Sequence, residues 1–205
     1  MKTIELYEFN ELSKEAQAYA IDRYRYEFDG IDAGNLTEWF ESELCDAYGL
    51  KDVEVSWSLS YSQGDGVSFT GEISEKALGV ILQAYDKALY ERLQAFKRRY
   101  DTQLFIDIRR VNYRYSHEYS TTIDIDVDSA VYNEDDVTSD IDTLEALIDD
   151  VSTTLERAYV DICTTLKWKG YDYIDGMESD ENTIEYFLGN EVLFYESGVQ
   201  APVFK

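Results

Sequence analysis

The segment of residues 53–73 is the feature that most restricts what this chain can fold into. In VEVSWSLSYS, apolar side chains alternate with polar ones. One face of an extended strand would therefore carry Val53, Val55, Trp57, Leu59 and Tyr61. The letters QGDG then supply turn residues, and VSFTGEI follows as a second extended run. The pattern predicts a β-hairpin, and with it an antiparallel sheet that has one buried face.

A similar pattern returns in the middle of the chain. The runs LFIDIRRVNYRY and EYSTTIDIDV both favour extended strands, and the turn between them falls near Ser116 and His117. They predict a second β-hairpin. A shorter apolar run, VLFYESG at residues 192–198, predicts one more strand near the C-terminus.

Helical periodicity fills much of the chain around these strands. Ser13 can cap a helix that runs to about Phe28. Residues 36–48 predict a second helix, which stops at Gly49. Ser74 can cap the run SEKALGVILQAYDKALYERLQAFKRRY, whose broad apolar face predicts one long packing helix.

Two more helical patterns lie in the C-terminal part of the chain. A long helix is predicted from Thr138, and Ser139 and Asp142 resemble a capping box at its start. Its apolar stripe continues to Leu166. A short helix is predicted after Ser179.

These signals together predict an α+β fold: an antiparallel sheet built from two β-hairpins plus a C-terminal strand, packed against long amphipathic helices. The sequence has one proline and no Gly/Ser-rich linker, which predicts a single compact domain over residues 1–205. Its parts would be an N-terminal helical pair at about 13–48, hairpin and helix units at about 52–168, and a C-terminal helix and strand at about 179–198.

Acidic residues dominate the charge of the chain. There are 43 Asp and Glu against 18 Lys and Arg, which gives a formal net charge of −25. Such a surface repels nucleic acid and anionic membranes, so we expect direct binding to neither. It attracts positively charged proteins and speeds the encounter with them. Adaptation to high salt would give a similar composition.

Other features favour the cytoplasm. The N-terminal letters MKTIELYEFNELSKEAQ lack the apolar run of a signal peptide. No stretch approaches the roughly 20 apolar residues of a membrane span. Cys45 and Cys163 have no CxxC spacing, so free thiols in a reducing compartment are expected.

The run TTIDIDVDSAVYNEDDVTSDIDTLEALIDD, residues 121–150, has many acidic residues and no Lys or Arg. A calcium loop is one interpretation, since Asp124, Asp126 and Asp128 fall at ligand positions. However, Ser129 stands where such a loop needs glycine, and the apolar residues between the acids alternate as in a strand. We therefore expect no metal site and no cofactor.

A set of catalytic carboxylates is the second interpretation of this run. General acid–base catalysis needs carboxyl groups in contrasting environments, and here acids have mainly acids as neighbours. The one histidine, His117, falls at a predicted turn. GDG at residues 64–66 has no strand-to-helix junction around it, so it predicts a hairpin turn and not a phosphate loop. We expect no catalytic residues and no enzymatic activity.

A surface that meets a positively charged partner is the third interpretation. Alternate strand residues share one face, and helical residues three or four apart share another. The carboxylates would then imitate a row of phosphates, although an acidic face that only keeps the protein soluble remains the alternative. The expected partner-binding residues are Asp124, Asp126, Asp128, Glu134, Asp135, Asp136, Asp142, Glu145, Asp149 and Asp150.

Basic residues cluster in one stretch of the sequence. They would either pair with acids inside the fold or form a small positive patch, and we expect pairing. The cluster consists of Lys97, Arg98, Arg99, Arg109, Arg110 and Arg114.

Three segments resemble a family of small uncharacterised proteins of bacteriophages and prophages. They are ELYEFNELSKEAQAYAIDRYR, SLSYSQGDGVSFTG and SDENTIEYFLGNEVLFYESG. The resemblance implies a phage accessory protein that acts in the bacterial cytoplasm, and it brings no catalytic residues. The acidity of the chain is similar to that of antirestriction and anti-CRISPR proteins that mimic DNA.

The leading functional hypothesis is a phage-encoded inhibitor that binds the basic groove of a nucleic-acid-handling or defence protein of the host. The alternative is a structural or regulatory interaction module that a partner recognises through the hairpin SYSQGDGVSF, with the charge serving solubility.

Overall fold

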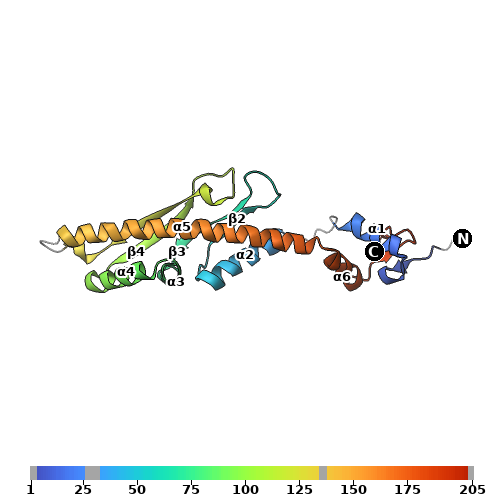
Figure 1. Ribbon diagram of the computed structural model, residues 1–205, viewed down its shortest axis with the longest axis horizontal. Coiled ribbons are helices and arrows are strands. Elements are labelled where there is room, and N and C mark those ends of the chain that lie inside the picture. The colour runs from blue at the N-terminus through green and yellow to red at the C-terminus, as the bar shows by residue number, and fades with distance from the viewer. Residues whose placement is uncertain (1–3, 26–32, 134–137, 203–205) are drawn as a thin grey trace. The chain divides into compact units, whose positions relative to one another are not determined.

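The computed structural model describes residues 4–25, 33–133 and 138–202 (Figure 1). Its fold is α+β, as predicted. Contacts divide the chain into two compact units, one of Gly34–Lys169 and one of Met1–Ala33 with Gly170–Lys205. The expectation of a single domain over residues 1–205 stays a prediction about how the chain folds, and each unit is described by itself.

The larger unit contains a four-stranded antiparallel sheet in the order β2-β3-β4-β5. Both predicted hairpins are present, and each follows the alternation of its sequence. The strands are β2 (Glu54–Ser58), β3 (Gly66–Ile73), β4 (Gln103–Arg110) and β5 (Thr121–Asp128). Strand β2 ends before Tyr61, which was expected on its apolar face, because the chain already turns there.

The two hairpins are joined over a short stretch. Strand β3 pairs with β4 only through Gly71, Glu72 and Ile73, whereas β4 and β5 pair along their whole lengths. Outside the joined stretch, Tyr159 takes the place of a neighbouring strand: the Phe69 N–H donates to its hydroxyl at 3.1 Å, and that hydroxyl donates to the Phe69 carbonyl at 3.0 Å. One side chain thus satisfies two buried backbone groups.

Three helices of this unit precede or separate the strands. Helix α2 (Ala33–Tyr48) ends at Gly49, whose φ of 70° favours glycine, as expected. The single long helix expected after Ser74 is instead two helices, α3 (Glu75–Tyr85) and α4 (Lys87–Tyr100). The break falls at Asp86, whose backbone leaves the helical region and whose side chain accepts from the Leu89 N–H at 2.9 Å.

Helix α5 (Thr138–Met177) lies along the sheet and has residues in both units. Its buried stripe, which includes Leu144, Val151 and Leu155, agrees with the predicted one. Ser139 lies inside the helix and is not its cap, since the helix already includes Thr138. The helix also continues past Leu166, because apolar residues go on recurring at helical spacing, among them Tyr171 and Ile174.

The core of the larger unit lies between the sheet and its helices. Phe69, Ile108 and Ile123 from the sheet line the same small apolar space as Leu155 and Ile162 from α5. The Phe69 and Tyr159 rings lie 4.7 Å apart. We call the side of the sheet that carries Phe69, Ile108 and Ile123 the inner face and the opposite side the outer face.

The smaller unit is built around aromatic side chains. Helix α1 (Lys14–Tyr24) begins after its predicted cap Ser13, and α6 (Asp180–Gly189) begins after Ser179. Phe28, the expected end of the first helix, lies outside the described residues. The rings of Phe187 and Phe194 pack at 4.9 Å, and Phe9 joins them.

The C-terminal strand does not join the four-stranded sheet, contrary to prediction. Strand β6 (Leu193–Phe194) pairs instead with β1 (Tyr7–Glu8). After Phe194 the chain folds back at once: the Gly198 N–H donates to the Tyr195 carbonyl, and the Tyr195 N–H donates to the Val199 carbonyl. The apolar run is therefore mostly a tight turn, and Phe194 serves the aromatic core.

Candidate functional site

The alternating run of strand β5 places its three aspartates on the outer face. Ile123 is half-buried and faces the apolar core, so Asp124, Asp126 and Asp128 point to the other side of the sheet. This is the strand geometry that the alternation predicts, and it differs from a metal-binding loop. Among the residues that the structure describes, no group of three or more His, Cys, Asp or Glu side chains is placed to hold a metal ion.

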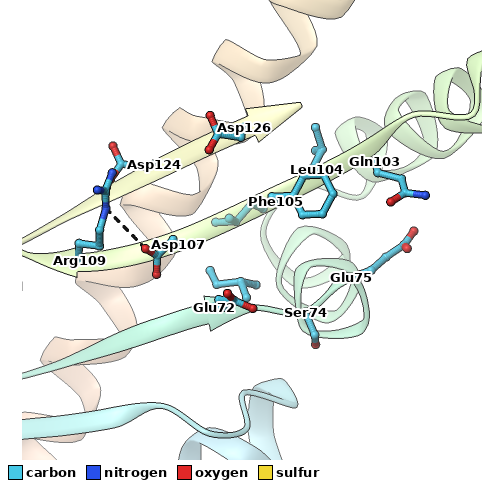
Figure 2. A pocket seen from close by; sticks show the side chains of 12 residues that line it. Glu72, Ser74, Glu75, Gln103, Leu104, Phe105, Asp107, Arg109, Asp124 and Asp126 are labelled. Atoms are coloured by element: carbon cyan, nitrogen blue, oxygen red, sulfur yellow. Dashed lines mark hydrogen bonds and ion pairs between the residues drawn. The ribbon is translucent and has the colours of Figure 1, made fainter. Parts of the chain in front are cut away.

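A hollow of about 520 Å³ lies in the outer face, between strands β3, β4 and β5 and the start of α3 (Figure 2). Two of the predicted residues, Asp124 and Asp126, line it. Sequence reasoning missed Glu72, Glu75 and Asp107, which line it as well. We call these five residues the outer-face acids.

Strand register explains why these carboxylates gather. Glu72 on β3 lies opposite Asp107 on β4, and Asp107 lies opposite Asp124 on β5. The hairpin pattern alone pairs Asp107 with Asp124. To place Glu72 in the same row, one must also know how β3 pairs with β4. No local signal in the sequence gives that register.

Arg109 compensates part of this charge. Its Nε donates to Asp124 at 2.7 Å, its Nη2 contacts the same carboxylate, and Nε lies 3.5 Å from Asp107 (Figure 2). Like charges opposite each other in a sheet repel, so this guanidinium stabilises the row. Because Arg109 is 62% exposed, the ion pairs contribute little to folding.

An exposed aromatic ring lies among the outer-face acids. Phe105 is 56% exposed and lies opposite Asp126 in the register of β4 and β5. Aromatic side chains are enriched at protein interfaces, which have a polar rim around their apolar centre. The hollow therefore offers both charge and apolar contact area.

The predicted acids of α5 are on a different surface. Asp142, Glu145, Asp149 and Asp150 are exposed, and the buried stripe of the same helix covers the inner face of the sheet. The helix acids and the strand acids therefore lie on opposite sides of the sheet-and-helix layer and do not form one continuous surface. Asp150 is also paired with Arg92 at 3.0 Å.

The remaining expected contact residues, Glu134, Asp135 and Asp136, lie outside the described residues. Three of the six residues of the basic cluster pair with acids, as expected, and the other three make different contacts within the chain. Lys97 bonds Glu75 at 2.6 Å, Arg99 lies 3.5 Å from Asp140, and Arg109 pairs with Asp124. Arg98 and Arg110 donate to backbone carbonyls, and Arg114 lies over the Tyr115 ring.

The hairpin SYSQGDGVSF has a braced loop between β2 and β3. The Asp65 carboxylate accepts from the backbone N–H of Ser60 at 2.6 Å and of Ser62 at 2.9 Å, and from the hydroxyls of both. Between these two serines, Tyr61 has a φ of 55° and is 66% exposed. A tyrosine in this left-handed conformation is strained, so the brace holds it there.

Two groups with raised pKa values lie in the core and not on these surfaces. Burial raises the pKa of the Tyr159 hydroxyl and of the Cys163 thiol. Both cysteines are free thiols, as expected; Cys163 is buried and Cys45 is half-buried. A buried thiol with a raised pKa is a poor nucleophile.

The comparisons with known proteins identify a family and no activity. A family model described as a domain of unknown function, DUF8835, matches residues 35–167. The chain belongs to this family, and the match covers the outer-face acids and the braced loop. No curated protein and no solved structure matches the chain. Among the described helices, none is long and apolar enough to cross a membrane.

Proposed function

We propose that this protein is a non-enzymatic, acidic binding protein whose outer-face acids occupy a basic groove of a nucleic-acid-handling or defence protein. The observation that carries the proposal is the row of Glu72, Asp107 and Asp124 across three strands, with Asp126 beside it in the same hollow. The resemblance to phage proteins supports a bacterial host protein as the partner and the host cytoplasm as the place of action.

The sheet makes these carboxylates suitable for charge recognition. Neighbouring strands lie about 4.8 Å apart, and residues two apart on one strand lie about 6–7 Å apart. Carboxylates held at such intervals by a rigid sheet present a regular negative array, and binding costs less entropy than ordering a flexible segment would. A groove of Lys and Arg that normally holds phosphates would accept this array.

The α5 acids have a separate role in this proposal. They face away from the hollow, and Glu145 and Asp149 recur at helical spacing with no basic residue between them. We assign them to long-range attraction and solubility, which depend on total charge and not on geometry. If the assignment is right, neutralising the outer-face acids and neutralising the α5 acids will affect partner binding differently.

The test uses two variants of equal charge. The sheet variant carries Asp107→Asn, Asp124→Asn and Asp126→Asn, and the helix variant carries Asp142→Asn, Glu145→Gln and Asp149→Asn. Proteins captured from a bacterial lysate at low salt are identified, and duplex DNA is added as competitor. The expected result is that nucleic-acid-binding proteins are captured by the wild type and the helix variant, released by DNA, and lost by the sheet variant. Equal capture by both variants would contradict the proposal.

A second candidate function rests on the braced loop. Tyr61 is exposed, and the hydrogen bonds of Asp65 to the residues on either side of it fix the loop, which is how a rigid anchor for a partner is presented. In this case the protein is an interaction module recognised through the hairpin. Capture would then depend on Tyr61, so that Tyr61→Ala abolishes it, and it would change little between low and moderate salt.

A further inference from the structure

A second hollow, of about 500 Å³, lies where the loops of the two hairpins meet. We call it the two-loop pocket. It belongs to the larger unit and shares no residue with the hollow of the outer face. It is lined by Gln63, Gly64, Asp65, Tyr115, His117, Glu118 and Tyr119.

Two glycines allow these loops to approach each other. A Cβ on Gly66 would lie 2.6 Å from the Cα of His117, and a Cβ on Gly64 would lie 3.0 Å from the Tyr115 ring. The guanidinium of Arg110 also links the hairpins, donating to the Ser56 hydroxyl and to the Tyr115 carbonyl, each at 2.8 Å. The pocket is therefore built by specific packing and is formed before any ligand binds.

Aromatic rings form one wall of the two-loop pocket. The rings of Tyr115 and His117 are stacked with centroids 5.4 Å apart, and Tyr119 meets His117 edge to face at 5.9 Å. The Nδ1 atom of His117 accepts from the Tyr119 N–H at 3.2 Å, so in the neutral ring the proton lies on Nε2. Tyr119 is 71% exposed, which leaves much of its ring open to a ligand.

The charged residues that line the pocket are both acidic. The Asp65 carboxylate is occupied by the brace of its own loop. In contrast, no hydrogen-bond donor or ion-pair partner for the Glu118 carboxylate is found within the described parts of the chain. A carboxylate beside aromatic rings, with no Lys or Arg in the lining, is suited to a cation.

The same segment already places guanidinium groups on tyrosine rings. Arg114 lies 5.3 Å from the centroid of Tyr115, and Arg110 lies 5.6 Å from that of Tyr113. The aromatic side chains of this connection thus accept planar cations within the chain itself. Tyr119 and Glu118 offer the same pair of contacts to a cation from outside.

We propose that the two-loop pocket binds an organic cation, a guanidinium or alkylammonium group. Its charge lies against Glu118 and its flat or apolar surface lies against Tyr119 and His117. The cation is either the side chain of a partner protein or a free small molecule. The site goes beyond the proposed function, because it requires nothing of the outer-face acids.

The experiment titrates N-acetyl-arginine amide into the full-length protein and follows binding by NMR chemical shifts. We expect saturable binding that perturbs the signals of Tyr119 and His117, and no binding of the uncharged N-acetyl-citrulline amide. Glu118→Gln should weaken binding at least about fivefold, the size of a contact of about 1 kcal/mol. Glu145→Gln removes an equal charge from the exposed face of α5 and should leave affinity unchanged.

Further arms test the ring and the source of the cation. Tyr119→Ala should weaken binding about as much as Glu118→Gln, and Tyr119→Phe should retain it; both replace an exposed side chain, so the fold is kept. Tetramethylammonium and an arginine-containing peptide are titrated in parallel. Tighter binding of the peptide supports a partner side chain, and equal binding supports a small molecule. No saturable binding, equal binding of citrulline, or equal weakening by Glu118→Gln and Glu145→Gln would overturn the proposal.

Discussion

The two hairpins of the larger unit contribute different properties to one sheet. The first, β2–β3, has a serine-rich outer face and a loop fixed by Asp65. The second, β4–β5, pairs along both strands and carries most of the outer-face acids. The first hairpin thus contributes a loop of fixed conformation, and the second contributes most of the negative charge of the outer face. Both hollows need the two hairpins together, because Glu72 in the hollow of the outer face comes from the first hairpin and His117 in the two-loop pocket comes from the second.

The largest expected effect concerns the contact between helix α5 and strand β3. Tyr159→Phe removes the hydroxyl that satisfies the N–H and the carbonyl of Phe69, so two buried backbone groups lose their partner. We expect the free energy of unfolding to fall by about 2–4 kcal/mol. Urea denaturation measures it, with the exposed Tyr113→Phe as control. A loss below about 0.5 kcal/mol would show that strand β3 does not need these two hydrogen bonds to α5.

Alkaline pH tests the same residue. Burial raises the pKa of Tyr159 above its ordinary value of 10.0, so the folded state holds this proton more tightly than the unfolded state. The contribution is fully present below pH 10.0 and is lost as the pH rises above it. We expect stability to fall more steeply above pH 10.0 in the wild type than in Tyr159→Phe, which denaturation at several pH values would show.

The next effect concerns the contact between the two loops. Gly66→Ala forces a methyl group to within 2.6 Å of the His117 backbone, so the loops must separate. We expect a loss of about 1–3 kcal/mol and a loss of cation binding in the two-loop pocket. Gly176→Ala is the control: it lies in α5 with open space around it, and should stabilise by about 0.5–1 kcal/mol. Unchanged stability of Gly66→Ala would mean that the loops do not pack closely in solution.

A smaller effect is expected from the brace of the first hairpin. Asp65→Asn keeps the size of the side chain but removes the charge that strengthens its hydrogen bonds to Ser60 and Ser62. We expect a loss of about 1–2 kcal/mol and faster hydrogen exchange of these two amides. Exchange at Ser120, on the second hairpin, should stay unchanged. If Ser120 exchanges faster as well, the two loops form one cooperative unit.

The smallest effect concerns the charge of the second hairpin. Asp124→Asn removes the main partner of Arg109, but both side chains are substantially exposed. We expect a change in stability below about 1 kcal/mol, which disappears in high salt. Denaturation at low and high ionic strength measures it. A larger loss would show that the row of acids depends on Arg109 for folding.

Local signals in the sequence predicted much of the fold. The side chains of Ser13, Ser74 and Ser179 each accept a hydrogen bond from the N–H three residues later and so cap a helix. This role depends on a few consecutive residues, so a short stretch of sequence predicts it. The alternation in both hairpins is an equally local signal, and the strands that it predicts are confirmed. The break at Asp86 was missed because the apolar stripe continues across it, and only the backbone shows that the aspartate starts a new helix.

The site was only partly predictable. Asp124 and Asp126 follow from alternation within one strand, whereas Glu72 joins them through the register of three residue pairs between hairpins. The strand acids and the helix acids are separated because α5 covers the inner face of the sheet. No local sequence pattern predicts which face a helix will cover. The two-loop pocket depends on the contact of Gly64 and Gly66 with residues some fifty positions later in the chain.

Strand β5 lies at an edge of the four-stranded sheet. An edge strand presents unpaired N–H and carbonyl groups, which makes it a template for the strand of another molecule. If two copies met edge to edge, Asp124, Asp126 and Asp128 of each would bring like charges together. The charge of the aspartates therefore opposes such pairing, and a replacement that neutralises them would remove this repulsion.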